Sequence, residues 1–168
     1  MDTISNHLQK VGLILILLLT ISCNSEKVQT KHFTKLTGII SPYMNYQPRG
    51  ELFGEDTLKW SYYKVEYDTK RRIKNISYFK KNFRSDNSYF GTHEVRYNYS
   101  TGGIKRTYFD SEGNKSSMWR HYYLGENIHE ERFELDDFGH KERLTLYDTS
   151  LQRVDNGLGS FEYRWERL

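Results

Sequence analysis

The chain has 168 residues with 25 basic and 22 acidic side chains, a net charge of +3 that is spread along its length. So small and scattered an excess argues against a nucleic-acid partner, and the single cysteine excludes an internal disulfide framework. Alanine, the best helix former, is absent, whereas 14 tyrosines, 9 phenylalanines and 3 tryptophans suit pleated, half-buried surfaces. The composition therefore predicts an all-β domain whose core is largely aromatic.

The first feature of the chain is a short apolar run from Val11 to Ile21, preceded by Lys10. A helix that crosses a bilayer needs about 20 apolar residues, whereas the core of a signal peptide has about 7 to 15. The run therefore predicts a signal peptide and not a transmembrane anchor. It ends without an A-x-A cleavage site, because Leu19 is followed by Thr20-Ile21-Ser22-Cys23.

This ending resembles the lipobox of bacterial lipoproteins, in which a small residue precedes an invariant cysteine. The resemblance implies that residues 1–22 are a lipoprotein signal peptide, and that Cys23 is lipidated and anchors the mature protein in the cell envelope. Several acyl chains on one residue give stable membrane anchoring. By similarity to enterobacterial sorting, Asn24 favours the outer membrane. The periplasmic and the exterior face both remain open.

The segment after the cysteine, residues 23–35, is polar and without period, which predicts a flexible tether. A single β domain is expected to follow at 36–168. Its first part, 36–46, suits a first strand or a capping segment, and Gln47-Pro48-Arg49-Gly50 predicts a turn. Turn signals then recur at intervals of about 8–12 residues, which favours an antiparallel up-and-down meander, either a curled sheet or a small barrel. Strands are expected at 60–67, 72–79, 92–99, 104–109, 115–123, 128–135, 141–147 and 159–166, with a polar loop at 80–91.

Four of the expected turns share one chemistry. The pattern Asp-x-x-Gly-x-Lys starts at Asp110 and at Asp136, and Asp68 and Asp148 start copies without the glycine. Aspartate at the first position of a type I turn caps the turn backbone, and glycine at the fourth adopts positive φ. These turns resemble the hairpin repeats of bacterial YD-repeat (Rhs-like) proteins and related small lipoproteins, over about residues 62–155. The resemblance implies hairpins that are stacked side by side.

Motifs for catalysis are missing, since the chain has no G-x-S-x-G, P-loop or dinucleotide fingerprint. We therefore expect a non-enzymatic protein without a cofactor, with a hydrolase as a lesser alternative. A metal site would need His129 and Glu131 on one strand face and His121 on the neighbouring strand. Cross-strand polar pairing explains these residues more simply, so no metal is expected. Asp136 and Asp137 are interpreted as turn residues and not as a calcium site.

The aromatic surplus is the remaining functional signal, because tyrosine and tryptophan are favoured at interfaces. It predicts a membrane-anchored lipoprotein that binds an unknown protein or glycan through an aromatic and charged sheet surface. Alternatives are an immunity or antitoxin-like protein, suggested by the resemblance to hairpin-repeat lipoproteins, and a lipocalin-like carrier of a small apolar ligand. The candidate binding surface consists of Trp60, Tyr62, Trp119, Tyr122, Tyr123 and Trp165.

Overall fold

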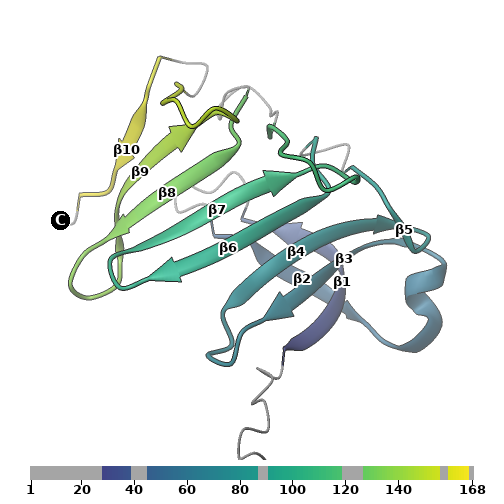
Figure 1. The fold of residues 1–168 in the computed structure, drawn as a ribbon. Coiled ribbons are helices and arrows are strands. Elements are labelled where there is room, and N and C mark those ends of the chain that lie inside the picture. The colour runs from purple at the N-terminus through teal and green to yellow at the C-terminus, as the bar shows by residue number, and fades with distance from the viewer. Residues whose placement is uncertain (1–27, 39–44, 87–90, 119–126, 156–158, 167–168) are drawn as a thin grey trace, which may run out of the picture.

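The protein folds as one curled antiparallel sheet (Figure 1). The computed structural model describes residues 28–38, 45–86, 91–118, 127–155 and 159–166. In this part ten strands form a single sheet. The all-β, up-and-down prediction is confirmed, and of the two forms expected the sheet takes the open one. No helix within the described ranges is long and apolar enough to cross a membrane.

Most strands lie where the alternation of aromatic and polar residues predicted them. Of the strand predicted at 115–123, the described part forms only isolated bridges at Lys115 and Met118, and the strand predicted at 159–166 is reduced to three residues. The elements are β1 (Gln29–Thr37), β2 (Gln47–Leu52), the 3-10 helix η1 (Gly54–Leu58), β3 (Ser61–Tyr67), β4 (Ile73–Lys80), β5 (Phe83–Arg84), β6 (Glu94–Ser100), β7 (Gly103–Phe109), β8 (Glu130–Leu135), β9 (Lys141–Tyr147) and β10 (Glu162–Arg164). Across the sheet the strands lie in the order β10-β9-β8-β7-β6-β4-β3-β1-β2, and β5 pairs with β4 outside that path.

The tether predicted for residues 23–35 is wrong from Gln29 onward, because β1 begins there. The strand pairs with β3 from Gln29 opposite Tyr67 to Phe33 opposite Tyr63, and Phe33 is buried. Backbone pairing on both sides of β1 and this one aromatic anchor hold a segment that is polar in sequence. The β domain therefore starts at 29 and not at 36.

The turn predicted at Gln47–Gly50 is also wrong, since these residues begin β2. This strand lies at the edge of the sheet and pairs only with β1, so the missing N–H of Pro48 does not break a ladder. Gly50 has φ +68°, and a Cβ at this position would lie 2.3 Å from the Thr34 hydroxyl oxygen. Proline and glycine, which usually mark turns, here suit an edge strand that another chain cannot easily extend.

Turns with one hydrogen-bonding pattern follow β3, β7, β8 and β9, as the aspartate pattern predicted. In each, one carboxylate oxygen accepts the backbone N–H of the second and fourth residues after the aspartate, at 2.8–3.0 Å. The third residue after the aspartate, between these two N–H donors, has positive φ even where it is not glycine, with +60° at Arg71 and +61° at Leu151. The capping aspartates are Asp68, Asp110, Asp136 and Asp148.

The two faces of the sheet differ in chemistry because side chains alternate along each strand. We call the face with Val65, Ile76, Val95 and Tyr108 the core face. These four residues lie in register across four strands, and all are buried. The segment before β2 crosses this face, since the Tyr46 hydroxyl lies 2.9 Å from that of Tyr108. The opposite face, which we call the outer face, carries ion pairs such as Glu94 with Arg96 and Glu130 with Arg132, beside aromatic rings such as Phe109.

Candidate functional site

The described members of the predicted aromatic binding surface, Trp60, Tyr62 and Trp165, do not gather on one surface. Trp60 is 61% exposed, but Tyr62 is only 6% exposed and stacks on Phe79 with ring centroids 5.2 Å apart. Trp165 is half-buried and packs on Phe133 at 6.2 Å. Of the described members, only Trp60 is therefore available to a partner. Trp119, Tyr122, Tyr123 and the predicted lipidation site Cys23 lie outside the described residues.

The metal alternative fails on geometry, because His129 and Glu131 face opposite sides of the sheet. The His129 ring packs edge-on against Phe109 at 5.8 Å, whereas the Glu131 carboxylate accepts a hydrogen bond from Tyr108. Tyr108 and Phe109 are consecutive in β7 and point to opposite faces. Among the described side chains, no three histidine, cysteine, aspartate or glutamate groups gather where they could hold a metal ion.

The sequence interpretation missed a repeated arrangement, His-Glu-x-Arg-aromatic, at 93–97 and 129–133. The spacing of 36 positions was a readable signal. In both copies the histidine Nδ1 lies 2.8–3.1 Å from a serine carbonyl oxygen. In both, the arginine Nε donates to the glutamate two residues earlier, at 3.0 Å for Arg96 and 2.6 Å for Arg132. Each of these copies therefore forms its own set of polar contacts on the sheet.

Each arginine of this repeat also covers an aromatic residue that directly precedes a capping aspartate, Phe109 before Asp110 and Tyr147 before Asp148. The Arg96 guanidinium lies 3.8 Å from the centre of the Phe109 ring, and that of Arg132 lies 4.1 Å from the Tyr147 ring. Burial alone would raise the pKa of Glu94, but the hydrogen bonds and charge of Arg96 hold that pKa below its usual value. The carboxylate is therefore ionised at neutral pH, and the pair is a stable part of the outer face.

A buried charged cluster lies at the centre of the core face. Arg106 on β7 and Glu131 on β8 are 1% and 2% exposed, and the Arg106 Nε lies 2.7 Å from the Glu131 carboxylate. Tyr108 donates its hydroxyl hydrogen to the same carboxylate, so Tyr46 donates to Tyr108. The Arg106 guanidinium also lies 4.4 Å from the Tyr46 ring centre and 4.5 Å from that of Phe133.

Opposing effects act on the charges of this cluster. Burial disfavours the charged form of Arg106, but the Glu131 carboxylate holds the pKa of Arg106 well above its ordinary value. Burial and the same carboxylate raise the pKa of Tyr108 well above its ordinary value, so this phenol remains a hydrogen-bond donor. The cluster is thus a buried ion pair with the Tyr108 hydroxyl as a hydrogen-bond donor beside it, and aromatic rings enclose the pair.

Next to this cluster lies a half-open cavity of about 190 Å³. Lys141, the first residue of β9, lies 3.9 Å from the Phe133 ring centre, and its Nζ donates to the Asn45 side-chain oxygen at 2.8 Å. Burial and the positive charge of Arg106 lower the pKa of Lys141 to about 7, although Glu131 opposes the shift. The lining residues are Asn45, Tyr46, Ile73, Tyr97, Tyr99, Ile104, Arg106, Phe133 and Lys141.

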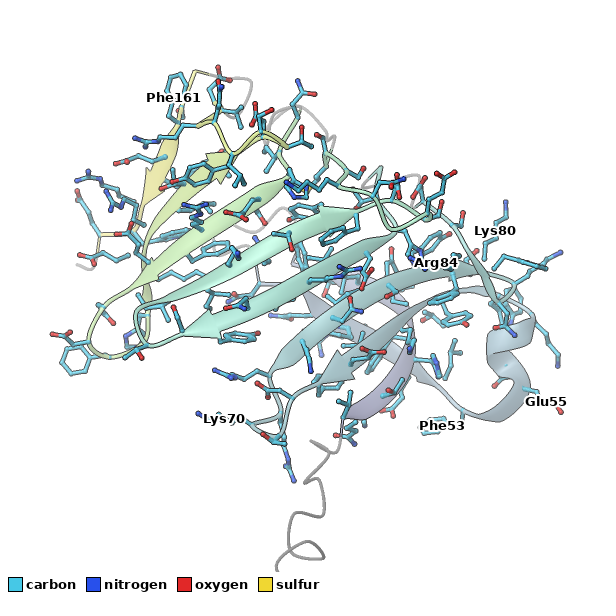
Figure 2. The ribbon with its side chains drawn as sticks, viewed as in Figure 1. Phe53, Glu55, Lys70, Lys80, Arg84 and Phe161 are labelled. Atoms are coloured by element: carbon cyan, nitrogen blue, oxygen red, sulfur yellow. The ribbon has the colours of Figure 1, made fainter. Side chains whose placement is uncertain are left out.

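An exposed group of aromatic and basic residues lies where β3, β4 and β5 meet. Ser61 pairs with Lys80, Lys80 pairs with Phe83, and the Lys81 N–H donates to the Trp60 carbonyl. Phe83 is 78% exposed. Figure 2 shows Lys80 and Arg84 at this corner and Lys70 at the other end of the same strands. We call this group the aromatic-basic corner; it consists of Lys59, Trp60, Lys80, Lys81, Phe83 and Arg84.

The cations of this corner differ from those of the outer face. Among the described residues, no carboxylate lies within ion-pair distance of Lys59, Lys80, Lys81 or Arg84. On the outer face, by contrast, carboxylates and arginines satisfy one another, as the repeated Glu-Arg pairs show. The corner can therefore offer positive charge to another molecule without first breaking an ion pair.

No known protein family, curated protein or solved structure that was compared with the chain matches it.

Proposed function

We propose that the protein is a non-enzymatic, lipid-anchored protein of the bacterial cell envelope that binds an acidic protein partner through the aromatic-basic corner. The supporting observation is the exposure of Trp60 and Phe83 beside four cations with no carboxylate partner in the described part of the chain. Tryptophan and arginine carry a large share of the binding energy in protein interfaces, because they combine apolar area with polar groups.

The corner is preferred to the outer face for an energetic reason. A partner that covers the outer face must remove water from ion pairs that already satisfy one another, and new contacts regain little of that free energy. At the corner, acidic groups of a partner gain new interactions with Lys80, Lys81 and Arg84. Rim charges of this kind raise the association rate and make binding sensitive to salt.

The proposed anchor at Cys23 is compatible with binding at the aromatic-basic corner. Gln29, the first residue of β1, pairs with Tyr67 at the end of β3, whereas the corner lies at the start of β3 beside Ser61. With a rise of about 3.3 Å per residue, the length of β3 separates the two by roughly 20 Å. A chain tethered through Cys23 therefore enters the domain far from the corner, which leaves the corner accessible.

The binding proposal is tested with the full-length, affinity-tagged protein in its native envelope. The corner variant, Phe83→Ala with Arg84→Glu, removes an exposed aromatic ring and reverses one charge. The matched control, Phe138→Ala with Lys70→Glu, makes the same changes in turns at the other end of the strands, where Phe138 is exposed. After cross-linking and detergent extraction, the wild type and the control should retain the same acidic protein, and the corner variant should lose it.

Binding of poly-L-glutamate, measured with and without added salt, gives a defined probe of the same surface. Salt-sensitive binding that the corner variant loses and the control keeps supports the proposal. Equal binding by all three proteins, or recovery of an anionic polysaccharide in place of a protein, overturns it.

The anchor is tested separately with Cys23→Ser. The wild-type protein should remain with membranes after a high-salt wash, because acyl chains and not charge hold it there. The variant should be released. Retention of the variant would contradict lipidation at Cys23 and would leave the corner experiment unaffected.

A further inference from the structure

The cavity beside Lys141 combines two kinds of surface that suit one class of ligand. Four of its nine lining residues are aromatic and two are isoleucines, which gives flat apolar walls. Its two ionisable cations are Arg106 and Lys141, and none of the nine lining residues carries a carboxylate. Ligand sites commonly have such apolar walls with a few polar groups that fix the orientation of the ligand.

We propose that this cavity binds a small organic carboxylate with a flat apolar body, the carboxylate at the Lys141 ammonium group and the body among the rings of Tyr46, Tyr97 and Phe133. This site is independent of the aromatic-basic corner. It lies on the core face, and none of its lining residues belongs to the corner.

The size of the cavity limits the ligand. An apolar cavity of about 150 Å³ holds a benzene molecule, so the 190 Å³ beside Lys141 accommodate one aromatic ring with a carboxylate. Because the cavity is half open, the carboxylate can retain part of its hydration. A phosphate would need more cationic partners, since Glu131 already neutralises Arg106 at 2.7 Å.

Lys141 supplies the charge that the ligand needs. Its Nζ donates a hydrogen bond to the uncharged Asn45 side-chain oxygen at 2.8 Å. Among the charged groups that act on it, Arg106 from β7 lowers its pKa and Glu131 from β8 raises it. With a pKa of about 7, the amine is only partly protonated at neutral pH. A bound carboxylate therefore draws a proton onto Lys141, and binding weakens as the pH rises.

The test uses the purified full-length protein in detergent, with sodium benzoate as the probe and benzamide as its uncharged counterpart. Calorimetry should detect benzoate binding that is at least several times tighter than benzamide binding. From pH 6 to pH 8 the protonated fraction of an amine with pKa 7 falls about tenfold, so the benzoate affinity should fall by about the same factor. Lys141→Met should lose benzoate binding and its pH dependence, whereas Lys105→Met on the outer face should keep both.

A second measurement on the wild type alone does not depend on the folding of a variant. The partly neutral Lys141 amine should react with trinitrobenzenesulfonate faster than the other lysines, as mass spectrometry of the labelled peptides can show. Benzoate, but not benzamide, should slow the labelling of Lys141. The proposal is overturned if benzoate shows no binding at millimolar concentration, if both probes bind equally, or if Lys141→Met binds benzoate like the wild type.

Discussion

Replacing Arg106 by methionine tests the buried ion pair most directly. Methionine keeps an unbranched, apolar side chain in the space between the Tyr46 and Phe133 rings, which lie 4.4 Å and 4.5 Å from the guanidinium. It leaves the Glu131 carboxylate, 2% exposed, without the cation that lies 2.7 Å from it. Removing one partner of a buried pair typically destabilises a protein by about 3–5 kcal/mol. That is a large share of a total stability of about 5–15 kcal/mol.

The assay is chemical unfolding of the purified protein in urea, followed by tryptophan fluorescence. The double variant Arg106→Met/Glu131→Gln should recover much of the loss, because a neutral amide costs less to bury than an unpaired carboxylate. Arg143→Met is the matched control. It breaks a 2.5 Å contact with Glu134, but both side chains are more than a third exposed and water screens the pair, so the loss should be much smaller than that of Arg106→Met.

The reasoning would be refuted if Arg106→Met lost no more stability than Arg143→Met. It would also be refuted if the double variant were as unstable as the sum of its two single variants. In either case, the burial of Arg106 and Glu131 would not control the stability of the core face.

Three further predictions concern the turns, Lys141 and the aromatic residues. Leu151→Gly should raise the free energy of unfolding by a few tenths of a kcal/mol up to about 1 kcal/mol, because it relieves a left-handed φ of +61°. Gly139→Ala, at +82°, should lower the free energy of unfolding by about 1 kcal/mol in the same urea assay. A loss of stability in Leu151→Gly or a gain in Gly139→Ala would contradict the turn assignment. The pKa of Lys141 is lowered to about 7 in the folded protein, whereas the pKa of this amine is about 10.4 in the unfolded chain. At a pH between these two pKa values, the unfolded state therefore binds more protons than the folded state. The stability of the wild type relative to Lys141→Met should therefore rise from pH 7 to pH 9, and a flat difference in urea midpoints would show that the amine is not shielded from water. Tyr62→Ala should destabilise the protein by about 3 kcal/mol, because its ring is buried against Phe79; Trp60→Ala should change stability by less than about 0.5 kcal/mol, and comparable losses would mean that Trp60 is part of the core.

The fold was largely predictable because its rules are local. In residues 94–99, Val95, Tyr97 and Tyr99 alternate with polar residues, and this alternation alone predicts a half-buried strand. An aspartate at the start of a turn likewise predicts the hydrogen bonds that cap that turn. The errors lie where pairing overrides local pattern. β1 was missed because its single buried aromatic, Phe33, is surrounded by polar residues, and β2 was missed because Pro48 and Gly50 are tolerated only at an edge.

The candidate sites were less predictable because they depend on contacts between strands. In β7, Arg106 lies two residues from Ile104 and from Tyr108, and in β8, Glu131 lies two residues from Phe133. Side chains two residues apart point to the same face, so both charged residues lie on the buried core face. Alternation alone could have flagged each of them, but only the register of β7 with β8 places Arg106 opposite Glu131. The contact of Lys141 with Asn45 spans 96 positions, and no local pattern reports it.

The repeated His-Glu-x-Arg-aromatic arrangement bears on how such a chain can change in length. Each copy brings its own arginine cover and is followed by an aspartate-capped turn, and β6 to β9 pair with their neighbours in sequence. A tandem duplication of one copy with its turns would add strands at this side of the sheet and leave the contacts of β1 to β4 in place. Gene duplication within the reading frame is thus a physically easy route by which a sheet of this kind gains or loses hairpins, and natural relatives that differ by whole hairpins are the expected trace of it.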